Sequence, residues 1–148
     1  MGILRSLFGK HPNPAEEIRR FENTIQLHQE QLFGITLYSK GIELMYSDQP
    51  ELVKMNRKSF QNVKDRIEPS IYAGESLLQQ VKADPSKVKH LKQFKFPPIS
   101  GHPMLDQMTQ RAQILVRTYE RMFPKRSKSE PLTEDELSSL MIEAANQL

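Results

Sequence analysis

The stretch that decides the fold is residues 18–46, "IRRFENTIQLHQEQLFGITLYSKGIELMY". Most of its apolar side chains recur in alternating steps of three and four, the spacing of one face of an α-helix. We call this row the seam; its members are Ile18, Phe21, Ile25, His28, Leu32, Ile35, Ser39, Ile42 and Tyr46. Polar residues such as His28 and Ser39 lower the stability of a helical seam but can fix its register. The stretch therefore predicts a long amphipathic helix that packs against another helix.

The second half of this helix carries a further apolar stripe. It consists of Phe33, Leu37 and Leu44, so we expect two neighbouring helices there and one neighbour for the first half. Gly34 and Gly41 each weaken an exposed helix by roughly 1 kcal/mol relative to alanine. A close approach of another helix at these positions would explain their presence.

The bounds of the first two helices follow from capping residues. Asn13 followed by Pro14 predicts an N-cap and a first helical position, and the helix runs to about Met45. In "SDQPE" (47–51), Asp48 and Glu51 have the spacing of a capping box that starts a second helix, which extends to about residue 81. Two long helices joined by a short turn predict an antiparallel hairpin.

Proline positions divide the rest of the chain. Pro69 lies inside the second long helix and predicts a kink or a break there. Asp84 and Pro85 can start a short helix with Val88 and Leu91 facing inward. A third helix is expected over residues 103–123, packed along the hairpin to complete a bundle over residues 14–123.

The C-terminal segment has the clearest helix start in the sequence. Residues 124–131, "PKRSKSEP", form a polar linker bounded by prolines. Thr133 and Glu136 then have the spacing of a capping box, and Leu132 and Leu137 that of a hydrophobic staple. We therefore expect an amphipathic, acidic helix over residues 132–148.

Composition restricts the function classes. The 148 residues suit one domain, include no cysteine and have a mean hydropathy of −0.60. The six glycines form no phosphate-binding loop, and the four histidines lack metal-ligand spacing. No apolar run is long enough to cross a membrane. The sequence thus predicts no catalytic, cofactor-binding or metal-binding residues, and we expect a cytoplasmic protein that is not an enzyme.

The N-terminal segment, residues 1–10 ("MGILRSLFGK"), has the pattern of a short interfacial helix. Its predicted membrane-contact residues are Gly2, Ile3, Leu4, Arg5, Leu7, Phe8 and Lys10. "MGILRS" also fits the myristoylation template, with Gly2 exposed once Met1 is removed. The alternative is that these apolar side chains cover the end of the helical bundle.

Two further features suggest partners. A lysine cluster near Phe94 and Phe96 predicts an anion-binding surface for lipid headgroups or nucleic acid; its members are Lys82, Lys87, Lys89, Lys92 and Lys95. The alternative is a solvated face with both phenylalanines turned into the core. The C-terminal helix presents an apolar edge that could dock into a partner protein or pack on the chain itself; its residues are Leu137, Leu140, Met141, Ala144 and Leu148.

Charge is unevenly distributed along the chain. Residues 132–148 carry a formal charge of −4 with no lysine or arginine, so the rest of the chain carries +7. A basic body with an acidic tail suits an anionic partner, or a tail that folds back onto its own body.

The sequence as a whole predicts an all-α protein: an antiparallel long-helix hairpin within a three- to four-helix bundle, with short amphipathic helices at both ends. Its expected function is a non-enzymatic adaptor or assembly subunit at the periphery of an anionic membrane or in a larger protein complex. Two alternatives stay open: a nucleic-acid-binding factor that uses the lysine cluster, and a chaperone or regulator that binds a partner protein through its last helix. The seam of the first helix could also pair with a second copy of the chain.

Overall fold

The computed structural model describes residues 13–96 and 103–147, and within these ranges the regular structure is entirely helical. The N-terminal segment, residues 97–102 and Leu148 lie outside the described residues. The helices are α2 (Pro14–Met45), α3 (Pro50–Ala83), the 3-10 turn η1 (Pro85–Lys87), α4 (Lys89–Gln93), α5 (Pro103–Met122) and α6 (Glu134–Ala145). The predicted all-α class is confirmed.

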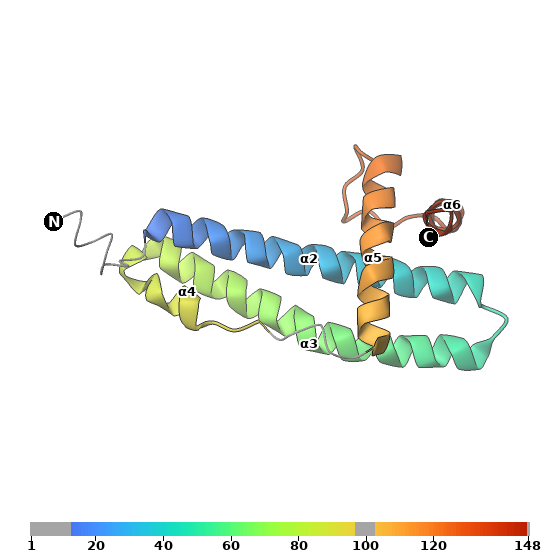
Figure 1. The fold of residues 1–148 in the computed structure, drawn as a ribbon, viewed down its shortest axis with the longest axis horizontal. Coiled ribbons are helices and arrows are strands. Elements are labelled where there is room, and N and C mark those ends of the chain that lie inside the picture. Colours follow the sequence, from blue (N-terminus) through green and yellow to red (C-terminus); the bar gives the residue numbers. More distant parts are fainter. Residues whose placement is uncertain (1–12, 97–102, 148) are drawn as a thin grey trace.

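Helices α2 and α3 form the predicted antiparallel hairpin (Figure 1). The backbone N–H of Ala15 donates to Oδ1 of Asn13 over 3.1 Å, which confirms Asn13 as the N-cap of α2. The capping box predicted at Asp48 and Glu51 is wrong. The N–H of Gln49 donates to the carbonyl of Tyr46 over 2.9 Å, so the turn extends one residue further and Gln49 becomes the N-cap without a side-chain bond.

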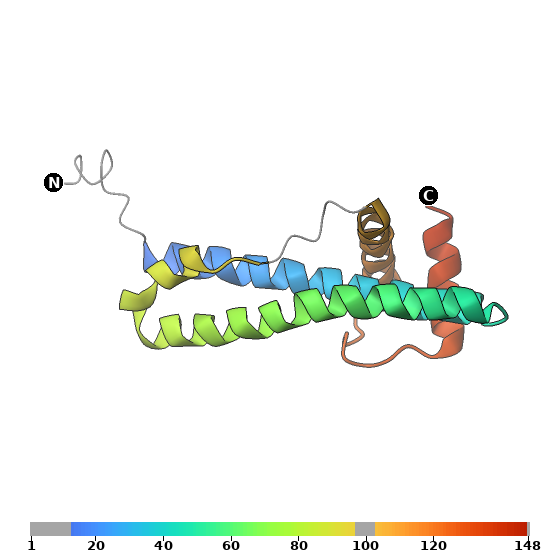
Figure 2. The same cartoon turned by 90° about the horizontal axis from the view of Figure 1, so that it is seen from below.

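Pro69 does not interrupt α3. The helix continues from Pro50 to Ala83, and Pro69 lies exposed on its surface. Of the two predicted outcomes, a break is therefore excluded. Figure 2 shows α3 as a bowed helix alongside α2. Proline removes the hydrogen bond to the carbonyl four residues earlier, which permits bending on the solvent side without unwinding the helix.

The seam of α2 packs within the chain, largely against α3. Its members from Ile18 to Ile35, apart from His28, share one cluster with α3 residues such as Val63, Ile67 and Ile71. The polar member Ser39 is 4% exposed, and the Asn56 side chain donates to its carbonyl over 3.1 Å and to its hydroxyl over 3.0 Å. This pair satisfies buried polar groups at a single alignment of the two helices, which favours one register.

Helix α5 crosses the hairpin and does not run along it as expected (Figures 1 and 2). It packs on α2, and α6 in turn packs on both α5 and α2. The crossing is possible because Gly34 leaves room for α5: a Cβ at this position would lie 2.8 Å from the carbonyl oxygen of Ala112. Gly41 similarly accommodates the side chain of Met141 on α6. The predicted close approach of another helix is confirmed at Gly34, where the neighbour is backbone, whereas Gly41 makes room for a side chain.

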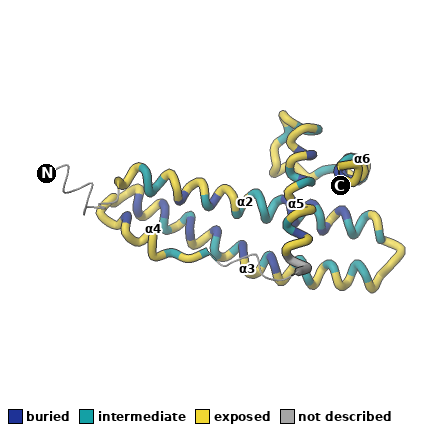
Figure 3. Tube along the Cα trace, viewed as in Figure 1, coloured by how far each residue is buried: buried dark blue, intermediate teal, exposed yellow. Residues whose placement is uncertain are grey.

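Two hydrophobic clusters result from this arrangement. The first joins α2, α3 and α4 and reaches α5 through Met108 and Ala112. The second joins the later part of α2 to α5 and α6, and it contains the predicted second stripe of Phe33, Leu37 and Leu44. In Figure 3 buried positions follow the facing sides of α2 and α3 and recur where α5 and α6 meet α2. Helix α2 is therefore common to both clusters.

Candidate anion-binding surface

The predicted lysine cluster lies on η1, α4 and the ends of the segments beside them. Asp84 starts η1 by accepting from the Ser86 backbone N–H over 3.2 Å and from the Ser86 hydroxyl over 2.6 Å. These hydrogen bonds lower the pKa of the Asp84 carboxyl below its ordinary value. Val88 and Leu91 are buried, as predicted, and anchor this short segment to α2 and α3. The lysines beside these two residues, Lys87, Lys89 and Lys92, are exposed.

We call residues 13–22 together with residues 81–96 the basic end. Its two segments meet because α4 folds back against the start of α2 (Figure 2). Seven lysine and arginine side chains belong to it, against four carboxylates. An excess of cations on one end of an elongated molecule creates a local positive potential.

Two of the predicted lysines are engaged by carboxylates of α2. Lys82 Nζ lies 3.7 Å from a carboxylate oxygen of Glu22, and Lys92 Nζ lies 3.7 Å from one of Glu17. Both pairs are partly exposed, so each contributes little to stability. They do fix where α4 and the end of α3 lie relative to the beginning of α2.

The other cations of the basic end are open to solvent. Arg20 pairs with Glu16 over 2.6 Å. Within the basic end, the exposed lysine and arginine side chains that make no ion pair with a described residue are Arg19, Lys87, Lys89 and Lys95. These four cations are available to an anion without breaking an internal contact.

The aromatic residues of this segment face the core. The rings of Phe94 and Phe96 lie 4.8 Å apart, and Phe96 stacks on His28 at 4.4 Å. Phe94 also meets Phe21 edge-on at 5.6 Å. Because both rings pack against the first cluster, the surface offers charge to an anion and no free phenylalanine face for stacking a base.

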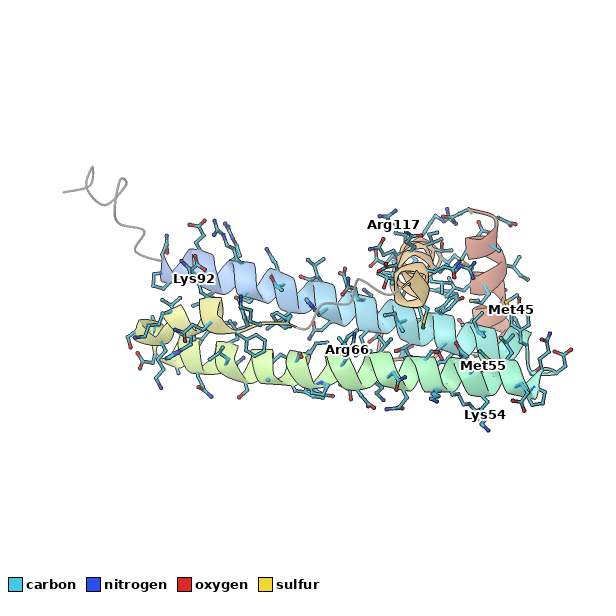
Figure 4. All side chains as sticks on the ribbon, turned by 60° about the horizontal axis from the view of Figure 1, so that its bottom comes forward. Met45, Lys54, Met55, Arg66, Lys92 and Arg117 are labelled. Atoms are coloured by element: carbon cyan, nitrogen blue, oxygen red, sulfur yellow. The ribbon has the colours of Figure 1, made fainter. Side chains whose placement is uncertain are left out.

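The predicted membrane-contact residues, Gly2 to Lys10, lie outside the described residues. Their point of attachment is described, because α2 begins at Pro14 directly after the capping residue Asn13. Lys92, labelled in Figure 4, lies at this end of the hairpin, whereas Lys54, Met45 and Met55 lie near the opposite end. The N-terminal segment thus joins the body beside the basic end.

The residues predicted to dock a partner protein pack on the chain itself. Leu137, Leu140 and Ala144 are buried in the second cluster, and Met141 packs against it. Leu148 lies outside the described residues. The sequence left open whether this edge packs on the chain itself or on a partner protein, and in this conformation it packs on the chain itself. Docking through this edge would therefore require α6 to detach from α2 and α5.

The attachment of α6 depends on a side chain that sequence reasoning missed. The predicted capping box is present: the Glu136 N–H donates to the Thr133 hydroxyl over 3.2 Å, and the Thr133 N–H donates to the Glu136 carboxylate over 3.0 Å. Arg126 of the linker forms an ion pair with the same carboxylate and donates to the Pro131 carbonyl over 3.1 Å. Its sequence setting, a basic residue in a polar linker, gave no signal of this role.

Hydrogen bonding changes the acidity of Glu136. The bond from the Thr133 backbone N–H, together with the Thr133 hydroxyl and the Arg126 guanidinium, lowers the pKa of this carboxyl below its ordinary value of 4.5. The charged form of Glu136 is thus the one that the attached α6 favours.

Among the described residues, no group of three or more histidine, cysteine, aspartate or glutamate side chains is placed to hold a metal ion. Of the helices described, none is both long and apolar enough to cross a membrane. His11 and His102 lie outside the described residues.

Comparison with known proteins assigns no family to the chain. No family model, no curated protein and no solved structure matches it. The function proposed for the basic end therefore rests on its own charges and contacts.

Proposed function

We propose that the protein is a non-enzymatic helical adaptor that attaches to an anionic membrane surface through its basic end and its N-terminal segment. The observation that carries this proposal is the position of the four unpaired cations. Arg19, Lys87, Lys89 and Lys95 belong to the same end of the hairpin as Asn13, the residue at which the N-terminal segment joins the body. The attachment point of the N-terminal segment and the lysines of residues 87–95 are thus close in space, although about eighty residues separate them in the sequence.

Attachment to a membrane surface needs both features. A short amphipathic helix or a single acyl chain binds only marginally, and a second signal is required for stable association. Each lysine or arginine close to an anionic leaflet contributes about 1 kcal/mol of attraction. Four unpaired cations therefore supply the second signal that the N-terminal segment lacks on its own.

The shape of the body suits an adaptor. Helix α2 has 32 residues and is thus roughly 48 Å long at 1.5 Å per residue. Attachment at the basic end would leave the hairpin turn, α5 and α6 away from the lipid. Those elements would remain accessible to a protein partner.

Vesicle flotation tests the proposal with a matched charge control. In one variant Lys87, Lys89 and Lys95 are changed to Glu; in the control Lys40, Lys54 and Lys58, which are also exposed and make no ion pair with described residues, are changed to Glu. Both variants alter net charge equally. We expect full-length wild type and the control to float with phosphatidylserine-containing vesicles and the first variant to remain unbound.

Salt and truncation complete this test. Binding should weaken as ionic strength rises, because exposed charges are screened within about 10 Å at 0.1 M salt. Removal of residues 1–10 should also reduce flotation while circular dichroism stays helical. Equal loss of binding in both charge variants, or flotation of the K87E/K89E/K95E protein at the wild-type level, would disprove attachment through the basic end.

Nucleic acid is a second candidate ligand for the same cations. Lysines that make no internal ion pair can neutralise phosphates whatever the sequence of the strand. A titration with random single-stranded oligonucleotides compares the two possibilities directly. Binding of oligonucleotides that is lost in K87E/K89E/K95E, without flotation of the wild type, would assign the basic end to nucleic acid.

A further inference from the structure

An open groove lies where α5 and α6 meet the last part of α2. Its volume is about 140 Å³, and we call it the Arg111 groove after its one charged residue. On the α2 side it follows the chain from Tyr38 to Tyr46, so it is about 12 Å long at 1.5 Å per residue. Met45, one of its lining residues, lies near the end of the hairpin opposite to Lys92 and the basic end (Figure 4).

The walls of the groove are largely apolar and come from three helices. Ile42 belongs to α2, Leu115 to α5 and Met141 to α6. Met45 is 51% exposed, so the groove leaves apolar surface in contact with water. Since an aliphatic cavity of about 150 Å³ holds a molecule of the size of benzene, the groove has room for an apolar chain of about six to eight carbons. Such a chain would remove this surface from water.

The charge of the groove favours an anion at one end. The Arg111 side chain is exposed and makes no ion pair with any described residue. Its Nη1 donates to the Tyr38 hydroxyl over 3.1 Å, which fixes the guanidinium at the Tyr38 end. A guanidinium has further N–H donors in a planar fork that matches a carboxylate, and the Tyr38 hydroxyl keeps its own proton to donate.

The lining also determines the orientation of an amphiphilic ligand. The end of the groove away from Tyr38 is formed by Met45 and Tyr46 and has no cation. Ala144 and Ala145 belong to the last turn of α6, where the helix dipole places partial negative charge. A carboxylate is therefore favoured beside Arg111 alone, with its apolar chain extending toward Met45.

We infer that the Arg111 groove binds a medium-chain carboxylate, such as a fatty acid of about eight carbons. The carboxylate accepts hydrogen bonds from the Arg111 guanidinium and the Tyr38 hydroxyl, and the methylenes lie against Ile42, Leu115 and Met141. Because the ligand contacts α2, α5 and α6 together, its binding strengthens the attachment of α6. The site is separate from the basic end and does not depend on its proposed function.

Calorimetric titration with sodium octanoate tests the inference. Sodium acetate has the same charged group without the chain, and octylamine has the same chain with the opposite charge. We expect saturable binding of octanoate to one site and much weaker binding of the two comparison compounds. The melting temperature should rise with octanoate concentration, and hydrogen exchange in α6 should slow.

Variants separate the roles of charge and space. Arg111→Gln should weaken octanoate binding about tenfold or more, because it removes a charged donor. Arg117→Gln is the matched control: Arg117 is exposed on the same helix, makes no ion pair with a described residue and lies outside the groove. Ala145→Leu adds side-chain volume to the groove and should block binding. The K87E/K89E/K95E protein should bind octanoate as wild type does.

Several results would overturn the inference. These are no saturable binding of octanoate to the wild type, octylamine binding as tight as that of octanoate, and wild-type affinity in folded Arg111→Gln protein. Loss of octanoate binding in K87E/K89E/K95E would place the ligand at the basic end instead. Sedimentation that shows a ligand-free dimer, lost in Met45→Asp, would assign the groove to a second copy of the chain.

Discussion

At Gly34 the backbone of α2 lies against α5 so closely that a Cβ atom would stand 2.8 Å from both the Ala112 carbonyl oxygen and Cγ2 of Val116. A backbone oxygen cannot move aside as a side-chain end can. At Gly74 the nearest atom to such a Cβ is the ring tip of Phe96, at 3.2 Å. The two glycines therefore differ in the kind of neighbour that an added methyl group would meet.

Gly34→Ala should destabilise the protein, whereas Gly74→Ala should be near neutral or stabilising. Overpacking costs about 1–3 kcal/mol, and the gain in helix propensity returns roughly 1 kcal/mol. For Gly34→Ala a net loss of about 1 kcal/mol or more in the free energy of unfolding is expected. Urea denaturation of both variants measures the difference, and an equal or greater stability of Gly34→Ala would refute the close approach.

Single residues were also where sequence reasoning was most and least successful. The role of the glycines could be predicted because they interrupt an otherwise strong helical pattern. The capping box at Asp48 failed, since a turn that is one residue longer moves the helix start and leaves the same residue types without their bonds. The spacing of a motif does not determine the backbone hydrogen bond on which it depends.

Among the helices, α6 shows how one element is attached by a few polar contacts around an apolar edge. Arg121 pairs with Glu143 over 3.0 Å along its length. At the start of α6 the Glu136 carboxylate accepts the hydrogen bond of the capping box and also forms an ion pair with Arg126. Because its pKa is lowered in the folded state, charged Glu136 stabilises the attached helix at pH values above the ordinary pKa of 4.5.

Acid should therefore loosen α6 before the rest of the molecule. As the pH falls below 4.5 and through the lowered pKa of Glu136, protonation removes this stabilisation. Hydrogen exchange measured by mass spectrometry across this range should show α6 losing protection first. Glu136→Gln, which can still complete a capping box, should reduce the pH dependence, and Glu134→Gln on the same turn should not. Unchanged acid sensitivity in Glu136→Gln would contradict this assignment.

Helix directions were harder to predict than helix bounds. The repeating stripe of α5 identifies the face that is buried, but the same stripe can lie along a neighbour or across it. Its crossing depends on Gly34 and on the space taken by α6, which are known only once the helices meet. The crossing also creates a groove between α2 and α5, lined by residues such as Gln31 and Thr109, which the pattern of either helix alone could not reveal.

Over the whole molecule, two hydrophobic clusters are organised around a shared α2. Leu140, which is 0% exposed, lies in the cluster of α5 and α6, and Val81, also 0% exposed, lies in the cluster of α3 and α4. The sequence patterns of α2, of the segment after Asp84 and of α6 predicted the cluster members that these parts contribute, such as Ile35, Leu91 and Leu140. It did not predict the contacts of Lys82 with Glu22 and of Lys92 with Glu17, because they join segments far apart in the chain.

Leu140→Ala and Val81→Ala should reveal how far the clusters are independent. Truncating the buried leucine should cost about 2–5 kcal/mol, and the smaller valine less. Hydrogen exchange should rise chiefly in α6 and the end of α5 for Leu140→Ala, and in α3 and α4 for Val81→Ala. A uniform rise over all helices in both variants would show instead that the molecule opens as one unit.

The position of α2 also has a consequence for how the polypeptide is made. All the other described α-helices contact α2, and all of them follow it along the chain. During synthesis the two apolar faces of α2 leave the ribosome before the other described helices do. The face that packs on α3 can be covered as soon as α3 has been made. The stripe of Phe33, Leu37 and Leu44 stays exposed until α5 and α6 follow. Nascent chains stalled before residue 103 should therefore be held by chaperones at that stripe and released once α6 has been translated.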